Sequence, residues 1–219
     1  MVDPQGYSAS DETDRLTTGA ASWAAAWVRH AVILIFVAAT YVLAGKLGLA
    51  LASVNASATA VWPPSGIALA AVLIFGGPVW PGIFLGAFLT NVTTAGTLTT
   101  SVLIAAGNTL EALCGGYLVN RFAGGRRAFH NVRDIFLFVL LAGLVSTCVS
   151  ATVGVTSLSL FGFAPWSAYG PIWLTWWLGD MVGAVVVAPV ILLWWANPRI
   201  AWTRTQRVEF LLSLLLSVV

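Results

Sequence analysis

The sequence predicts an all-α membrane protein: a polytopic transmembrane helical bundle with six complete spans plus the start of a seventh. Three observations lead to this fold class. Of the 219 residues, 59% are hydrophobic and only 8% are charged, whereas a typical soluble domain is about 25% charged. Apolar runs of about 20 residues recur along the chain, which is the length that a helix needs to cross a bilayer. The basic residues fall almost entirely between those runs.

The order of polar and apolar segments divides the chain into a tail and a membrane domain. Residues 1–22 are polar and show no apolar periodicity, so we expect a disordered cytoplasmic tail there. The integral membrane domain then covers residues 23–219. Its expected spans are, in chain order, about 31–53, 63–75, 80–94, 98–120, 134–158, 172–195 and 208–219. The last is too short to cross about 30 Å of hydrocarbon, so we expect further sequence to follow it in the parent protein.

The distribution of basic residues predicts the orientation in the membrane. With a cytoplasmic amino terminus, nine of the ten Lys and Arg residues lie on one side, and only Lys46 falls inside a span. The expected links at 54–61, 92–97 and 159–171 contain no Lys or Arg. This is the positive-inside pattern. It predicts a multi-pass protein whose amino terminus is cytoplasmic.

The stretch "VWPPSGIALAAVLIFGGPVWPGIFLGAFLTN" from Val61 to Asn91 contains two Trp-Pro steps. Proline is tolerated in the first turn of a helix, where its missing amide would have no partner. Both steps are therefore expected helix starts, with the indoles in the headgroup belt. The glycines that follow each step allow neighbouring helices to approach closely. At the first step, the helix start is also expected to present free amides and a positive dipole end.

Three ionisable residues fall inside the expected spans: Lys46, Glu111 and Asp180. Placing Asp or Lys at the centre of a membrane helix costs about 2.5 to 3.5 kcal/mol, so such a group needs a partner or a function. Helical spacing puts Asn108 on the same face as Glu111, and aromatic residues on the face of Asp180. We therefore expect the three groups to meet in one polar chamber in the outer half of the bundle.

The candidate ligand-binding set combines these groups with polar and aromatic side chains on the same faces or at the same depth. Its members are Lys46, Trp62, Ser65, Asn91, Asn108, Glu111, Trp173, Trp176, Trp177 and Asp180. The alternative left open is a buried network of Lys46 with the two carboxyls that only fixes helix register.

Other kinds of site find no support in the residue pattern. The sequence has no nucleophile elbow, phosphate loop, metal triad or HExxH motif, so we expect no catalytic residue, metal or cofactor. Cys114 and Cys148 lie far apart in apolar segments and are interpreted as packing residues. The net charge of +2 gives no reason to expect a nucleic-acid partner.

The Val61–Asn91 stretch, together with "GNTLEALCGGYL" and "WLTWWLGDMVGAVVVAPVILLW", resembles the membrane-associated sensor family, type one. The resemblance runs from about Tyr41 to Trp195. It implies an integral membrane sensory domain of the kind that precedes histidine kinases and cyclic-di-GMP enzymes in bacteria. The matching residues are Trp62, Pro63, Pro64, Ser65, Gly66, Trp80, Pro81, Gly82, Asn91, Asn108, Glu111, Trp177, Gly179 and Asp180.

These observations predict the sensory input domain of a bacterial signal-transduction protein in the inner membrane, with an unknown small ligand in an outer-half polar pocket. The expected partners are the lipid bilayer, that ligand and a cytoplasmic effector domain in the same or a partner chain, with a homodimer left open. This segment is not expected to be an enzyme, although a kinase or cyclase domain could follow Val219.

Two other functions remain open at this stage. The first is a small-molecule transporter or a substrate-capturing membrane subunit, because midplane polar groups and helices interrupted by Pro or Gly also mark transporters. The second is a scaffold subunit of a membrane complex.

Overall fold

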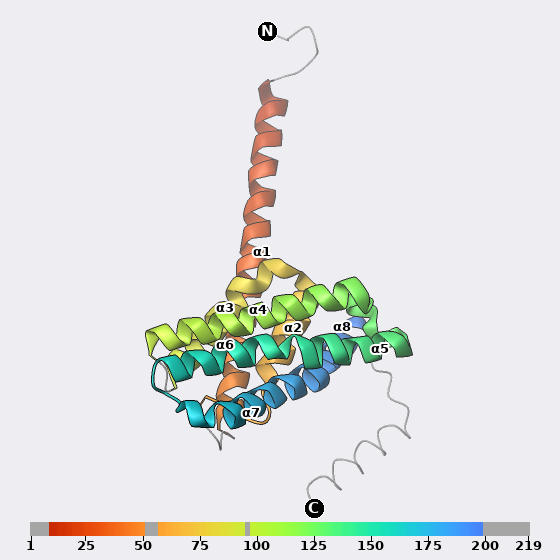
Figure 1. Ribbon diagram of the computed structural model, residues 1–219. Helices are drawn as coiled ribbons and strands as arrows, with labels where there is room; N and C mark the ends of the chain where they lie inside the picture. The colour runs from red at the N-terminus through yellow and green to blue at the C-terminus, as the bar shows by residue number, and fades with distance from the viewer. Residues whose placement is uncertain (1–8, 51–56, 95–96, 199–219) are drawn as a thin grey trace, which may run out of the picture.

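The computed structural model describes residues 9–50, 57–94 and 97–198, with side chains from Trp23 onward, and the regular elements of this part are all helices (Figure 1). Four helical stretches in it are long and apolar enough to cross a membrane. They are Trp23–Leu49, Leu98–Phe122, Val132–Leu160 and Trp166–Ala196. Two expected spans, α2 (Pro63–Phe75) and α3 (Trp80–Val92), have only 13 residues each, which gives about 20 Å of helix.

The first helix, α1 (Ala9–Leu49), is the longest element. It begins inside the segment expected to be a tail, of which residues 1–8 lie outside the described residues. In Figure 1 the amino-terminal part of α1 extends away from the other helices. The expected seventh span, at 208–219, also lies outside the described residues.

Two of the long stretches contain a π-helical segment in the middle. Between α5 (Val132–Phe138) and α6 (Thr147–Leu160) lies one at Val139–Val145. Between α7 (Tyr169–Val182) and α8 (Ala188–Ala196) lies another at Gly183–Val187. The sequence predicted uninterrupted helices here. Since π segments are rare and frequently occur at functional sites, they direct attention to this part of the bundle.

Close approaches at glycines show the relative directions of the first helices. Leu34 of α1 lies against Gly82 of α3, and further along the same two helices Gly45 lies against Thr90. The residue numbers rise together, so α1 and α3 run in the same direction. The alternation of up and down passes that the sequence predicted requires this arrangement.

Helix α2 is the centre of the bundle, although it is short. Nine of its 13 residues are buried, which explains why it carries no charged residue and several small ones. It runs parallel to the α7–α8 stretch: near its start Gly66 packs against Gly183, and near its end the Phe75 ring meets Trp195 edge to face at 5.4 Å. In Figure 1, α4 (Leu98–Phe122), α6 and α7 lie in front of it.

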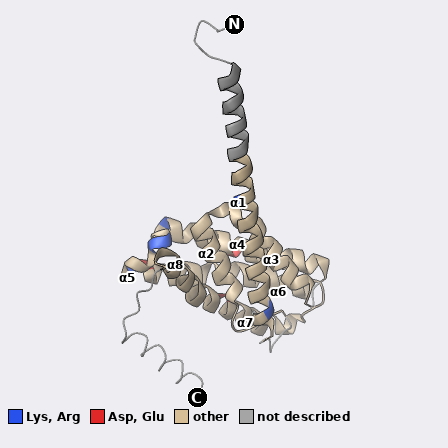
Figure 2. Ribbon diagram, turned by 180° about the vertical axis from the view of Figure 1, so that it is seen from behind, with Lys and Arg blue, Asp and Glu red and all other residues tan. Residues whose placement is uncertain are grey.

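Basic side chains gather at one end of the bundle. Arg126 and Arg127 lie in a short 3-10 helix, Gly125–His130, between α4 and α5. Arg121 precedes it at the end of α4, and Arg133 follows it on α5. Figure 2 shows this patch of Lys and Arg at the end of the bundle near α5. The other end, where α4 and α7 begin, has no Arg among the described residues.

Candidate functional site

Glu111 of α4 and Asp180 of α7 lie beside each other in the interior of the bundle. Their side chains are 4% and 0% exposed, respectively. The two carboxyl groups are electrostatic neighbours of each other. Two of the three ionisable residues expected to meet therefore share one site, called here the carboxyl pair.

The start of α2 reaches this pair because α7 presents bare backbone to it. The Trp62 amide donates a hydrogen bond to the Gly179 carbonyl oxygen at 3.0 Å. A Cβ atom on Gly183 would overlap the carbonyl oxygen of Trp62. Because the start of α2 lies so close to α7, the Ser65 hydroxyl can donate to Asp180 Oδ1, at 2.8 Å. The Trp-Pro-Pro-Ser-Gly motif thus places a hydroxyl donor on the carboxyl pair.

The expected row of free amides at the start of α2 is wrong. Pro63 and Pro64 have no amide hydrogen, and the Ser65 amide donates to the Trp62 carbonyl oxygen at 3.2 Å. What α2 offers to the carboxyl pair is therefore the hydroxyl of Ser65.

A second chain of hydrogen bonds reaches the pair from α6. Ser150 Oγ donates to Asn108 Oδ1 at 2.7 Å and accepts from Trp176 Nε1 at 3.1 Å. The same hydroxyl lies near both carboxyl groups, but it gives its only hydrogen to Asn108. Sequence reasoning missed Ser150. The signal was available: Ser146, Ser150 and Gly154 recur at intervals of four and mark a small, polar helix face.

Trp62 and Trp176 close the site on one side. Both are buried, and with Ala58 and Thr59 they line a cavity of about 10 Å³, close to the smallest space that holds one water molecule. The Trp62 ring also meets Tyr41 of α1 edge to face at 6.4 Å. Neither carboxyl lines this cavity, and in this conformation both are buried.

Each group of the carboxyl pair has one oxygen atom without a hydrogen-bond partner among the described residues. Glu111 Oε2 and Asp180 Oδ2 have no hydrogen-bond donor in the described part of the chain. Carboxylates only accept hydrogen bonds, so a bond between the two groups requires a proton on one of them. Asn108 Nδ2 is likewise buried without an acceptor among the described residues. Such unpaired buried groups are uncommon and call for an explanation.

Lys46 does not belong to this cluster, which corrects the expectation of a shared chamber for all three ionisable groups. Its ammonium donates to Thr94 Oγ1 at 2.7 Å and to the Thr90 carbonyl oxygen at 3.2 Å. Among the described residues no ion pair joins it to the carboxyl pair, so the alternative Lys–carboxylate network is not formed either. Asn91, next to Thr90 on α3, donates to its own helix at the Ala87 carbonyl, 2.9 Å away.

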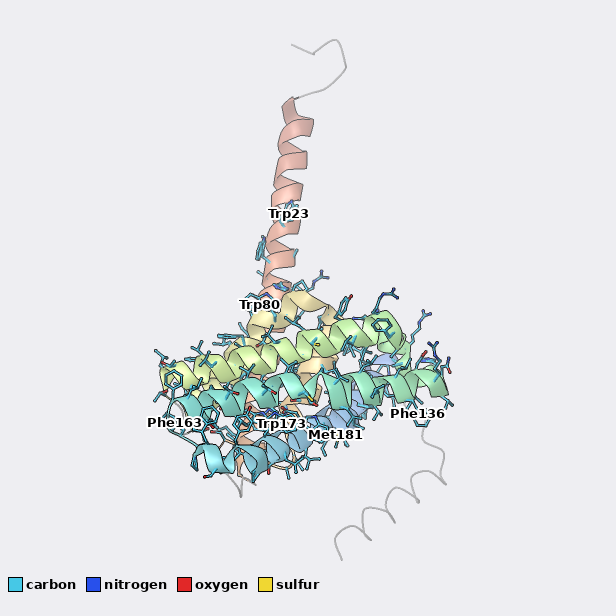
Figure 3. All side chains as sticks on the ribbon, viewed as in Figure 1. Trp23, Trp80, Phe136, Phe163, Trp173 and Met181 are labelled. Carbon is cyan, nitrogen blue, oxygen red and sulfur yellow. The ribbon has the colours of Figure 1, made fainter. Side chains whose placement is uncertain are left out.

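The other two tryptophans of the candidate set, Trp173 and Trp177, face α6 and the nearby 139–145 π segment. Trp173 lies between α6 and α7 (Figure 3) and donates to Thr152 Oγ1 at 3.1 Å. Its ring stacks on Trp177 at 5.8 Å, and Trp177 donates to the Leu144 carbonyl oxygen at 3.1 Å. Leu144 belongs to the 139–145 π segment. Of the three tryptophans on α7, only Trp176 is bonded into the chain of hydrogen bonds at the carboxyl pair.

Comparison with known families settles what kind of module this is. The MASE1 family model matches residues 33–219, which is most of the chain. The chain belongs to the MASE1 family. MASE1 is a membrane-associated sensor domain family of bacterial signalling proteins. No curated protein and no solved structure matches the chain.

MASE1 membership is consistent with the apolar helices and with a role in sensing rather than in catalysis. Within the described residues of this MASE1 domain, the carboxyl pair is the place where buried charge, unpaired polar atoms and π segments coincide. Asp180 lies three residues before the 183–187 π segment, and Gly143 of the other π segment packs against Val185 in it. The π segments of both long stretches therefore meet next to the pair.

Proposed function

We propose that this MASE1 domain is the sensory input of a bacterial histidine kinase or cyclic-di-GMP enzyme, and that it detects a small ligand at the carboxyl pair. We place it in the inner membrane with its amino terminus in the cytoplasm. The observation that carries the proposal is the buried contact of Glu111 with Asp180, joined to Ser65 and Ser150 but to no described Lys or Arg. Ionisable groups inside a membrane bundle usually mark function.

The chemistry of the site favours a small cation as the ligand. Two ionised carboxylates in contact repel each other in a poorly solvated site, so they need a shared proton or a bound cation. Glu111 and Asp180 are buried, so the ligand must be small, and we propose an alkali metal ion, ammonium or a small amine.

Ligand binding would be transmitted through the packing of three helices. The carboxyl pair joins α4 to α7, and the Ser65 hydroxyl ties α2 to α7 at the same place. A ligand shifts a conformational equilibrium only by its different affinity for the two states. A cation held between the carboxyls favours the arrangement that keeps α4 and α7 close. The α8 helix continues from α7 through the π segment and would carry the change onward.

The test is a thermal-stability series on the full chain in lipid nanodiscs, with sodium, potassium, ammonium and methylammonium as probes. At a concentration of 100 times Kd, a ligand stabilises by about 2.7 kcal/mol, which raises Tm by about 5–10 °C for a chain of this size. We expect at least one probe to do this for the unmodified chain and not for Glu111→Gln or Asp180→Asn. Asp134→Asn, at the basic end of the bundle, is the matched control and should respond normally. Equal Tm shifts in the unmodified chain and all three variants, or no Tm shift in any of them, would contradict the proposed site.

The same variants separate sensing from transport. In the parent protein, the probe that stabilises the domain should change the effector output, and Asp180→Asn should abolish this response. Vesicles that contain the domain should show no uptake of the probe above protein-free vesicles. Uptake that depends on Asp180 would favour the transporter alternative over the sensor.

A further inference from the structure

A long apolar groove lies on the outside of the bundle between α1 and α3, away from the carboxyl pair. Its volume is about 550 Å³, and Lys46 lines it. Its lining includes the small residues Ala38 and Ala39 and larger side chains such as Leu43 and Leu85. Both leucines are exposed, at 66% and 47%.

The groove has the length of one membrane leaflet. Along α1 its lining runs from Ile35 to Lys46, which corresponds to about 16 Å at 1.5 Å per residue. One leaflet contributes about half of the 30 Å hydrocarbon core. An extended acyl chain therefore fits along the groove, with its polar end at Lys46.

Lys46 gives that end a positive charge without an acidic partner. Among the described residues it forms no ion pair, and two of its three donor hydrogens are accounted for by Thr94 Oγ1 and the Thr90 carbonyl oxygen. Both acceptors are neutral, so neither of them offsets the positive charge of the ammonium, and one donor hydrogen is left. These two bonds also hold the ammonium against α3, whereas a lysine that only reaches for water would extend away from the helices. A cation fixed at the mouth of an apolar groove is complementary to an anionic lipid.

We propose that the α1–α3 groove binds one anionic phospholipid of the phosphatidylglycerol class. The phosphate accepts from the remaining donor of Lys46 Nζ, and one acyl chain lies between Leu43 and Leu85. This site is independent of the ligand proposed for the carboxyl pair, because Lys46 makes no described contact with that pair.

Native mass spectrometry of the full chain tests the site, after reconstitution with equal amounts of phosphatidylglycerol and phosphatidylcholine. We expect one retained phosphatidylglycerol per chain. Lys46→Gln should lower that occupancy about five-fold, the effect of one basic residue near a membrane surface. Lys46→Arg should retain the lipid. The control is Arg121→Gln, an exposed basic residue at the other end of the bundle, which should leave the occupancy unchanged.

A second variant tests the apolar part of the site without changing any charge. Ala39 is exposed and lines the groove, so Ala39→Phe fills the groove while leaving the core packing intact. We expect it to lower phosphatidylglycerol occupancy as strongly as Lys46→Gln, with an unchanged Tm.

Full occupancy in Ala39→Phe would overturn the proposal. So would an equal loss in Lys46→Gln and Arg121→Gln, which would indicate a general attraction to basic residues. Retention of a free fatty acid in place of the phospholipid, or disulfide-linked dimers of Leu43→Cys, would assign the groove to another occupant.

Discussion

At the scale of single residues, Ser65 shows how the sequence compensates a buried charge. A helix normally begins with several free amides, but Pro63 and Pro64 remove two of them and the Ser65 amide bonds to Trp62. The first free donor of α2 is therefore a side chain, and it is directed at Asp180. A hydroxyl can donate to a carboxyl in either protonation state, so this contact survives proton uptake by the pair.

Ser65→Ala should destabilise the domain because it removes a donor from Asp180 Oδ1 while the carboxyl stays buried. Leaving a buried acceptor without its partner costs about 1–3 kcal/mol, which lowers Tm by about 2–10 °C in a chain of this length. Differential scanning fluorimetry in detergent measures this change. Ser167→Ala, at an exposed position, is the control and should melt as the unmodified chain does. A Ser65→Ala protein with unchanged Tm would show that the bond to Asp180 contributes nothing.

Lys46 shows the limit of residue-level prediction. The depth of each ionisable group along its helix followed from the sequence, but the direction of each helix face relative to its neighbours did not. The face of α1 that carries Lys46 packs against α3 and its threonine oxygens. Glu111 and Asp180 were predicted to meet and do so, because α4 and α7 both pack against α2.

At the scale of elements, the contact between α2 and α7 depends on glycine. Gly66 and Gly183 face each other, and a Cβ atom on Gly183 would overlap the Trp62 carbonyl oxygen. Backbone atoms that are already in contact cannot move aside to make room, whereas the end of a flexible side chain can. The two helices therefore approach closely enough for Ser65 to reach Asp180 only while these positions carry no side chain.

Gly183→Ala should separate α2 from α7 and destabilise the bundle. Overpacking of this kind costs about 1–3 kcal/mol, and we expect Tm to fall by about 2–10 °C. Because the Ser65–Asp180 bond is lost as well, combining Gly183→Ala with Ser65→Ala should lower Tm by less than the sum of the single effects. Gly170→Ala is the matched control, since a Cβ atom there meets nothing within 4 Å. Fully additive effects would contradict the coupling of the two contacts.

The helix boundaries show which elements the sequence could specify. The bounds predicted for α2 match the structure, because Pro63 and Gly76 mark its ends chemically. The π segments at 139–145 and 183–187 escaped prediction, because their residues are the same small and β-branched types that fill ordinary membrane helices. The π segments differ from ordinary helix in how the two stretches pack against each other. This packing cannot be deduced from the periodicity of apolar residues in the sequence.

At the scale of the whole molecule, two short helices belong to a bundle with four long ones. Helices α2 and α3 are too short to span a bilayer alone, yet α2 is surrounded by protein and α3 packs along α1. A helix can end within the membrane when other helices cover the unpaired backbone groups at its end. The basic patch near α5 and the end without Arg then define two faces, and the excess of basic residues predicts which face is cytoplasmic.

Cysteine labelling tests this orientation directly. In a background with Cys114→Ala and Cys148→Ala, His130→Cys lies at the basic end and Ser167→Cys at the opposite end. Both positions are exposed and are separated by the Val132–Leu160 stretch. In intact spheroplasts a membrane-impermeant maleimide should label Ser167→Cys and reach His130→Cys only after permeabilisation. Solubilised protein, in which both positions react, controls for reactivity. The reverse pattern would place the amino terminus outside, and labelling of both positions in intact spheroplasts would mean that Val132–Leu160 does not cross the membrane.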